Sequence, residues 1–221
     1  MKNGLIGKSL VAAVLVGTLT LTACSTAWIG EAEQIVAVLI PATANLLSLI
    51  AALQGLDISA ADAKAIQSAG SQAEADLQLM ESLVVQYGKA DTATQAGLLS
   101  QIQVSLGSVQ SDLNGLLPAL HIEDAATKAK VTAVVGVLIS EVESMAAIVP
   151  LASGNSPSAV SFRASAQAHK HVPLTASKFV SSYNATMTAK TGNAELDRAA
   201  SGLRIHSHGE LERWASGGLL K

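Results

Sequence analysis

The sequence predicts an all-α protein: an antiparallel up-down four-helix bundle with a partly helical, loosely packed basic C-terminal tail. Hydrophobic residues make up 49% of the chain but aromatic residues only 3%, a composition typical of packed helices rather than sheets. Between residues 31 and 149 the apolar residues recur at alternating spacings of three and four. This pattern places one apolar seam on each helix and favours left-handed packing against a neighbour. Turn and capping signals divide the same region into four segments of similar length.

The first expected helix contains an uncharged run of 19 residues, from Ile35 to Leu53, which is long enough to span a membrane. Its two faces differ, however. One carries Ala37, Pro41, Asn45, Ser48 and Ala52, and the opposite one carries Val36, Leu39, Ile40, Thr43, Leu47 and Ile50. A bundle helix needs such a polar stripe, whereas a helix surrounded by lipid does not. We therefore interpret the run as a bundle helix, with membrane insertion through Ile35–Leu53 as the alternative.

The second expected helix lies between two glycines. Gly55 ends the first helix, and Ser59 with Asp62 forms a capping box at the start of the second. Gly88 is the expected end. The apolar seam between them consists of Ile66, Ala69, Ala73, Leu77, Met80, Val84 and Tyr87.

The third expected helix begins either at Thr92, paired with Gln95, or at Asp91. Its seam, at spacings of three and four, consists of Leu99, Ile102, Leu106, Val109, Leu113, Leu116 and Leu120. Pro118 cannot continue a helix interior, so the helix is expected to end or kink there.

The fourth expected helix starts behind Glu123 and Asp124, whose charges suit the positive end of a helix dipole. Its seam consists of Val131, Val135, Leu138, Val142, Met145 and Val149, and Pro150 stops it. Five glycines fall inside these helices: Gly70, Gly97, Gly107, Gly115 and Gly136. Each glycine either lets a neighbouring helix come close or has no such role and is simply tolerated within a long bundle. We favour the second interpretation.

The N-terminal residues have the pattern of a secretory leader. Lys2 and Lys8 precede an uncharged, mostly apolar run over residues 9–20, and small residues follow. That run is too short to cross about 30 Å of hydrocarbon. Leu21, Thr22, Ala23 and Cys24 come next, and Cys24 is the only cysteine in the chain. A lone cysteine has no partner for an intramolecular disulfide.

These four residues resemble the lipobox of bacterial lipoproteins: an aliphatic residue, a small or β-branched residue, a small residue and cysteine. The resemblance implies a diacylglycerol on the Cys24 thiol, cleavage before Cys24 and acylation of the new amino group, commonly with palmitate. Two or more acyl chains hold a protein stably on a membrane. In that class, Ser25 rather than Asp after the cysteine favours the outer membrane over the inner one. The resemblance covers residues 1–24 only and identifies no family for the rest.

Charge is unevenly distributed along the chain. Residues 31–149 hold 13 acidic and 4 basic residues, a net charge of −9, and residues 150–221 hold 4 acidic and 8 basic residues, a net charge of +4. The expected parts are a signal peptide (1–23), a lipidated tether (24–30), the four-helix bundle (31–150) and a basic tail containing Ser, Ala and His (151–221). The tail's charge is too dilute to predict nucleic-acid binding.

Within the tail, residues 151–172 have no clear period and are expected to form a linker. A modest helix is expected over Leu174–Lys190, closed by Gly192. Its apolar residues are Leu174, Phe179, Tyr183 and Met187. Asn193 can cap a second short helix.

The tail also holds two His-x-His pairs, His169/His171 and His206/His208. In an extended segment, residues i and i+2 point the same way, so each pair would present two imidazoles to one metal. On a helix the two rings would diverge. Because no third ligand stands at a fixed spacing, we assign no metal ligand. A metal- or small-molecule-binding lipoprotein, using these histidines or the bundle interior, stays an alternative.

The sequence carries no Gly-rich phosphate loop, nucleophile elbow, HExxH or paired-cysteine motif. Glu141 and Glu143 are two apart on a helix and diverge, and Glu74, Asp76 and Glu81 suggest a solvated face. We therefore assign no catalytic residue and no cofactor, and expect a non-enzyme. The leading hypothesis is a lipid-anchored, periplasm-facing envelope protein that acts by binding or scaffolding. Its partners would be the membrane, through Cys24, and an envelope protein, with the oligomeric state left open.

Overall fold

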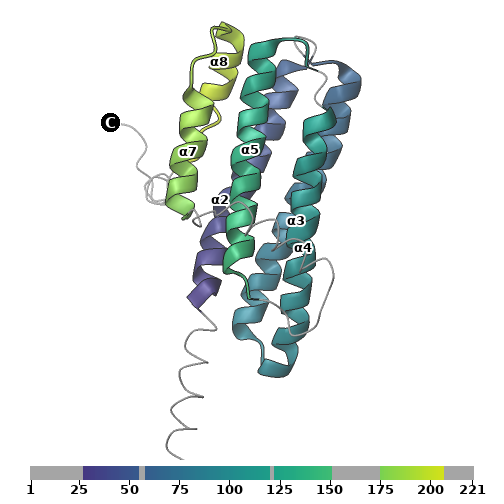
Figure 1. Ribbon diagram of the computed structural model, residues 1–221, viewed down its shortest axis with the longest axis vertical. Helices are drawn as coiled ribbons and strands as arrows, with labels where there is room; N and C mark the ends of the chain where they lie inside the picture. The colour runs from purple at the N-terminus through teal and green to yellow at the C-terminus, as the bar shows by residue number, and fades with distance from the viewer. Residues whose placement is uncertain (1–26, 55–57, 120–121, 151–174, 207–221) are drawn as a thin grey trace, which may run out of the picture.

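The computed structural model describes residues 27–54, 58–119, 122–150 and 175–206. The regular elements in these ranges are all α-helices (Figure 1). The six helices are α2 (Ala27–Leu53), α3 (Ala60–Lys89), α4 (Thr92–Ala119), α5 (Ala125–Ile148), α7 (Ala176–Thr188) and α8 (Ala194–Ser201). No β-strand occurs in these ranges. The all-α prediction is therefore confirmed for the part of the chain that is described.

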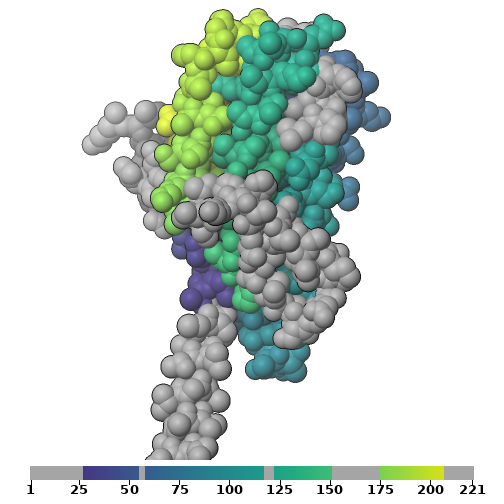
Figure 2. Space-filling view, in the orientation of Figure 1, coloured from purple at the N-terminus to yellow at the C-terminus, as the bar shows by residue number. Residues whose placement is uncertain are grey.

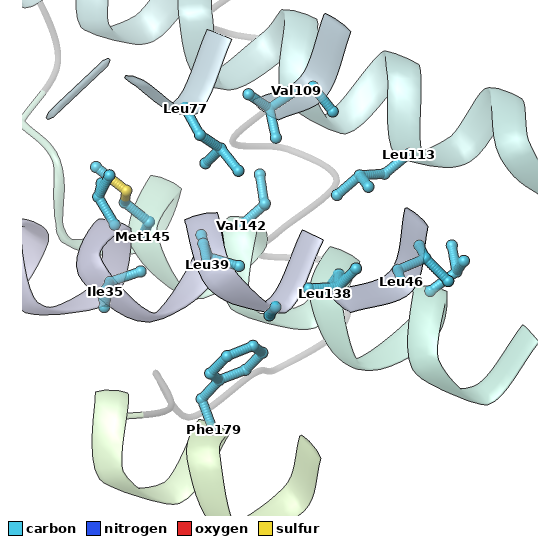
Figure 3. Close-up of a cluster of buried hydrophobic side chains, with 14 of the residues drawn as sticks. Ile35, Leu39, Leu46, Leu77, Val109, Leu113, Leu138, Val142, Met145 and Phe179 are labelled. Carbon is cyan, nitrogen blue, oxygen red and sulfur yellow. The ribbon is translucent and has the colours of Figure 1, made fainter. Parts of the chain in front are cut away.

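The four long helices enclose one hydrophobic core. Helix α2 packs against α3 and α5, and α4 packs against α3 and α5. The expected seam residues that the structure describes are buried, except Ala69, which is half-buried; Leu120 lies outside the described residues. Figure 3 shows Leu39, Leu77, Val109 and Val142, one from each long helix, directed toward the same interior. At one end of the α2–α3 contact the rings of Trp28 and Tyr87 lie 5.1 Å apart between centroids.

The helix boundaries follow the capping signals. The Ser59 hydroxyl accepts a hydrogen bond from the Asp62 N–H at 3.1 Å, which confirms that Ser59 caps α3. Of the two starts expected for the third helix, Asp91 is the cap, because its Oδ1 accepts from the Thr94 N–H at 2.9 Å. Asp124 caps α5 in the same way, accepting from the Thr127 N–H at 2.7 Å. Each cap pairs a backbone donor that the first turn leaves free.

Helix α2 begins at Ala27, within residues expected to form the tether. It keeps Pro41 inside the helix. Its core-facing residues are Trp28, Ala32, Ile35, Val36, Leu39, Ala42, Thr43, Leu46, Leu49, Ile50 and Leu53. Ala37, Ser48 and Ala52 are exposed, as expected for the polar stripe. Asn45, from the same stripe, is half-buried because the C-terminal segment covers it.

One of the five helical glycines marks a close approach. A Cβ built on Gly70 would overlap Cδ2 of Leu47 in α2, because non-bonded carbon atoms cannot come so close. The other four, Gly97, Gly107, Gly115 and Gly136, have nothing within 4 Å of such a Cβ. The tolerance interpretation thus fits those four, and it is wrong for Gly70.

The tail differs most from expectation. Helices α7 and α8 form near their expected positions, but residues 175–206 are not loosely packed: Phe179, Tyr183 and Met187 are fully buried. Their spacing of four places them on one face of α7, which lies on α2 and α5. Figure 2 shows α7 lying against α5, and α8 packs on α7 and α2. The chain turns at Gly192 in the loop before α8. The φ angle there is 88°, a positive value that glycine adopts readily because it has no Cβ.

Candidate functional site

Several residues singled out from the sequence lie outside the described ranges. Cys24 lies three positions before the first residue of α2. His169, His171 and His208 also lie outside, so the geometry of the two histidine pairs stays a prediction. His206 is described, and its side chain is exposed. Among the described residues, no group of three or more histidine, cysteine or acidic side chains is placed to hold a metal ion.

The acidic residues of α3 are not uniformly solvated. Glu81 is exposed, as expected, but Asp76 is half-buried. Burial raises the pKa of the Asp76 carboxyl and, together with the nearby charge of Asp76, that of Asp112 on α4. These two acids share the α3–α4 contact, where the Ser105 hydroxyl donates to the Asp76 carbonyl oxygen at 2.9 Å.

Helix α7 is held in the groove between α2 and α5 by its aromatic residues. The Phe179 ring points into the core cluster that contains Leu39 and Leu138 (Figure 3). The Tyr183 hydroxyl donates to the Ala42 carbonyl oxygen of α2 at 3.3 Å, and the two rings of α7 lie 5.9 Å apart between centroids. Burial raises the pKa of Tyr183. The groove therefore receives an apolar face whose Tyr183 hydroxyl keeps a polar partner, as the burial of a tyrosine usually requires.

Lys130 of α5 caps the C-terminal end of α7. Its ammonium donates to the carbonyl oxygens of Thr186, Met187 and Ala189, at 2.9, 3.1 and 2.5 Å. The last carbonyls of a helix have no partner within the helix, and a cation there also complements the helix dipole. Lys130 is only 4% exposed. Burial lowers the pKa of its ammonium, with the Asp197 carboxylate acting in the opposite direction.

The segment after α8 is fixed by a pair of hydrogen bonds between one side chain and the backbone. Asn184 donates from Nδ2 to the Ile205 carbonyl oxygen at 2.8 Å and accepts from the Ile205 N–H at 2.9 Å. Asn45 of α2 donates to the Leu203 carbonyl oxygen at 3.0 Å. The Asn184 side chain therefore holds the backbone of Ile205, and Asn45 holds that of Leu203.

Glu141 is the most unusual side chain of the described part. It is 0% exposed, and neither carboxyl oxygen has a hydrogen-bond partner. Burial raises the pKa of this carboxyl to about 8, and the nearby charge of Glu31 on α2 adds to the effect. Glu143 diverges from it, as expected, and accepts a hydrogen bond from Gln110 of α4 at 3.3 Å. Such a carboxyl is largely neutral near pH 7 and costs free energy because its polar atoms are unpaired.

The sequence pattern did not predict that Lys130 and Glu141 are buried. It assigned α5 a single seam, yet a second stripe, Lys130, Val134, Glu141 and Ser144, is buried as well. The signal for this stripe was present in the apolar residues of α5 that fall outside the seam. A helix that is apolar on two faces needs a second neighbour, and α7 is that neighbour.

No protein-family model, no curated protein and no solved structure matches this chain. Two of the described helices, α2 and α5, have the length and composition that a membrane span requires. The core helix of a soluble protein and a signal sequence share those properties, so this is weak evidence for membrane association.

Proposed function

We propose that this chain is a lipid-anchored protein of the cell envelope, held at the membrane through Cys24, facing the periplasm and acting by binding or scaffolding. In this proposal the four long helices form an antiparallel up-down bundle that stands on the bilayer. The lipobox-like Leu21–Cys24 motif, just ahead of a helix built into the core, carries the proposal.

The arrangement of α2 supports this reading. Its apolar face is used by the core, where Ile35, Leu39 and Leu46 are fully buried. A helix whose apolar side packs on protein has less of that side to offer lipid. The membrane contact would then come from acyl chains on Cys24, only three positions from the first residue of α2. An anchor so close to the helix would also restrict how the bundle is oriented on the bilayer.

The contacts along the long helices support the bundle arrangement. Gln103 and Gln110 of α4 lie seven positions apart, and they donate to Pro150 and Glu143 respectively. The residue number of the partner decreases by seven while that of the glutamine increases by seven. This is the pattern of two helices that run in opposite directions. The two-residue joint between α3 and α4 likewise requires a reversal of the chain.

Fractionation of cells that produce a Cys24→Ala variant tests the anchor. The wild type and a matched Ser25→Ala control are expected in the membrane fraction, with density separation placing the wild type in the outer membrane. Cys24→Ala is expected to be uncleaved and unlabelled by palmitate. Export of the same residues behind a non-lipoprotein leader is expected to give a soluble periplasmic protein. Palmitate labelling of Cys24→Ala equal to the wild type would contradict lipidation at Cys24.

A second candidate, membrane insertion through Ile35–Leu53, draws on the length and composition of α2. The protein exported behind the non-lipoprotein leader separates the two. If it stays with membranes after alkaline carbonate extraction, α2 is inserted and the anchor is not what holds the protein. Release into the soluble fraction would favour the lipid anchor.

A further inference from the structure

Lys130 and Glu141 stand at opposite ends of the contact between α5 and α7. Eleven residues separate them along α5, which is about three helical turns and about 16 Å, so both lie on the same face of that helix. Met187, which Lys130 contacts, also stands eleven residues from Ala176, the first residue of α7. Because α5 and α7 lie side by side in opposite directions (Figure 1), Glu141 lies level with the first turn of α7.

The two ends of α7 are held very differently. Three hydrogen bonds from Lys130 hold the C-terminal end. At the N-terminal end, the capping residue Thr175 makes no side-chain cap hydrogen bond, and the polar atoms of Glu141 are unpaired. Among the described residues, the first turn of α7 therefore makes fewer polar contacts with α5 than the last turn does. By the register given above, it lies over a group that ionisation would make much more costly to bury.

Few charges act on Glu141. The charged group of α2 that affects it is Glu31, which disfavours its ionisation. From α4, Gln110 bonds to Glu143 instead, and on α7 the nearest basic residue in sequence to the first turn, Lys178, is exposed. On α5 itself, Lys130 is about 16 Å away and bound to carbonyl oxygens. Among the described residues, no cation offsets a negative charge at this position.

We propose that α7 is a proton-controlled strap, which closes the groove between α2 and α5 while Glu141 is neutral and opens from its first turn when Glu141 releases its proton to solvent. Opening pivots on the Lys130 end. The groove lies between α2 and α5, so the strap controls exposure of the two most apolar helices that the structure describes. This inference is independent of how the protein is anchored.

Hydrogen exchange of the full-length protein between pH 5 and 9, followed by mass spectrometry and corrected for intrinsic exchange rates, tests the strap. One proton is released on opening, so the opening equilibrium of residues 176–188 is expected to rise about tenfold per pH unit and to level off above about pH 8. Glu141→Gln is expected to remove this pH dependence. Glu143→Gln, on the same helix but bonded to Gln110, is the matched control and is expected to keep it.

Three results would overturn the strap: no pH dependence in the wild type, the same dependence in Glu141→Gln, or an equal rise in α3, which would mean that the whole chain opens. Circular dichroism establishes that each variant is folded. If Glu141→Gln does not fold, Glu141→Leu replaces it, since an apolar side chain of similar size suits a buried site. The expected outcome for Glu141→Leu is likewise an opening equilibrium that does not change with pH.

Discussion

The ammonium nitrogen of Lys130 lies 3.1 Å from the carbonyl oxygen of Met187, so a base in α5 ends a helix that begins 46 positions later in the chain. This contact changes how the two oppositely charged halves are understood. The basic residues of the described tail, Lys178, Lys190, Arg198 and Arg204, are all exposed. Residues 175–206 are therefore held by apolar burial and by a cation of the acidic half, while their own bases stay at the surface.

Replacing Lys130 with Met tests this contact. The change leaves three carbonyl oxygens without their donor, and hydrogen bonds to charged groups are worth about 1.5–3 kcal/mol. We expect the free energy of unfolding in urea to fall by about 2–3 kcal/mol. Lys128→Met, two positions earlier and exposed, is the control and should change it by less than about 0.5 kcal/mol. Equal effects of the two changes would mean that the Lys130 bonds do not stabilise the fold.

Glu141 should make stability depend on pH. Its pKa in the folded protein is raised to about 8, from an ordinary value of 4.5. Stability from this group is thus fully present below about pH 4.5 and is lost as the pH rises toward 8, by up to about 1.4 kcal/mol per pH unit. The measurement is urea unfolding of the wild type minus that of Glu141→Gln across this range, which removes the contribution of the other acids. A difference that is flat with pH would show that Glu141 titrates normally.

Gly70 and Gly136 should respond oppositely to alanine. At Gly136 an added methyl group meets nothing, so Gly136→Ala should stabilise the protein by about 0.5–1 kcal/mol through helix propensity. At Gly70 the methyl group meets Leu47, and the gain should be absent or reversed. Gly70→Ala in a Leu47→Ala background should recover it. A full gain for Gly70→Ala alone, measured by thermal or urea unfolding, would show that Leu47 moves aside freely.

Ser59 should contribute to stability as the cap of α3. Ser59→Ala removes the oxygen that pairs the Asp62 N–H and should cost about 1 kcal/mol. Ser71→Ala, at an exposed position inside the same helix, is the control and should be neutral or slightly stabilising. If Ser59→Ala is as harmless as the control, solvent replaces the cap without loss.

The long helices could be predicted from the sequence because their signals are local. Alternating spacings of three and four gave the buried seams, and Ser59 and Asp124 gave the caps. The choice between Thr92 and Asp91 as a start stayed open, since both residue types are favoured at the N-cap of a helix. It was settled by which oxygen accepts the Thr94 N–H.

The position of α7 on the bundle could not be predicted, because it depends on contacts between residues far apart in the sequence. Tyr183 and Ala42 are separated by 141 positions, and Lys130 and Met187 by 57. A single sequence shows that Phe179, Tyr183 and Met187 share a face, but not which surface that face meets. The residues of the candidate site were hidden for the same reason, since a Lys and a Glu on a helix usually indicate its solvated side.

The position of α7 in the chain sets an order of events during synthesis. Helices α2 to α5 are complete once residue 148 has been made, yet the cover of the α2–α5 groove arrives only with residues 176–188. For that interval the growing chain presents an uncovered apolar groove, the kind of surface through which incomplete chains aggregate. A segment made after the four long helices therefore covers α2, and chains that stop before residue 176 lack that cover.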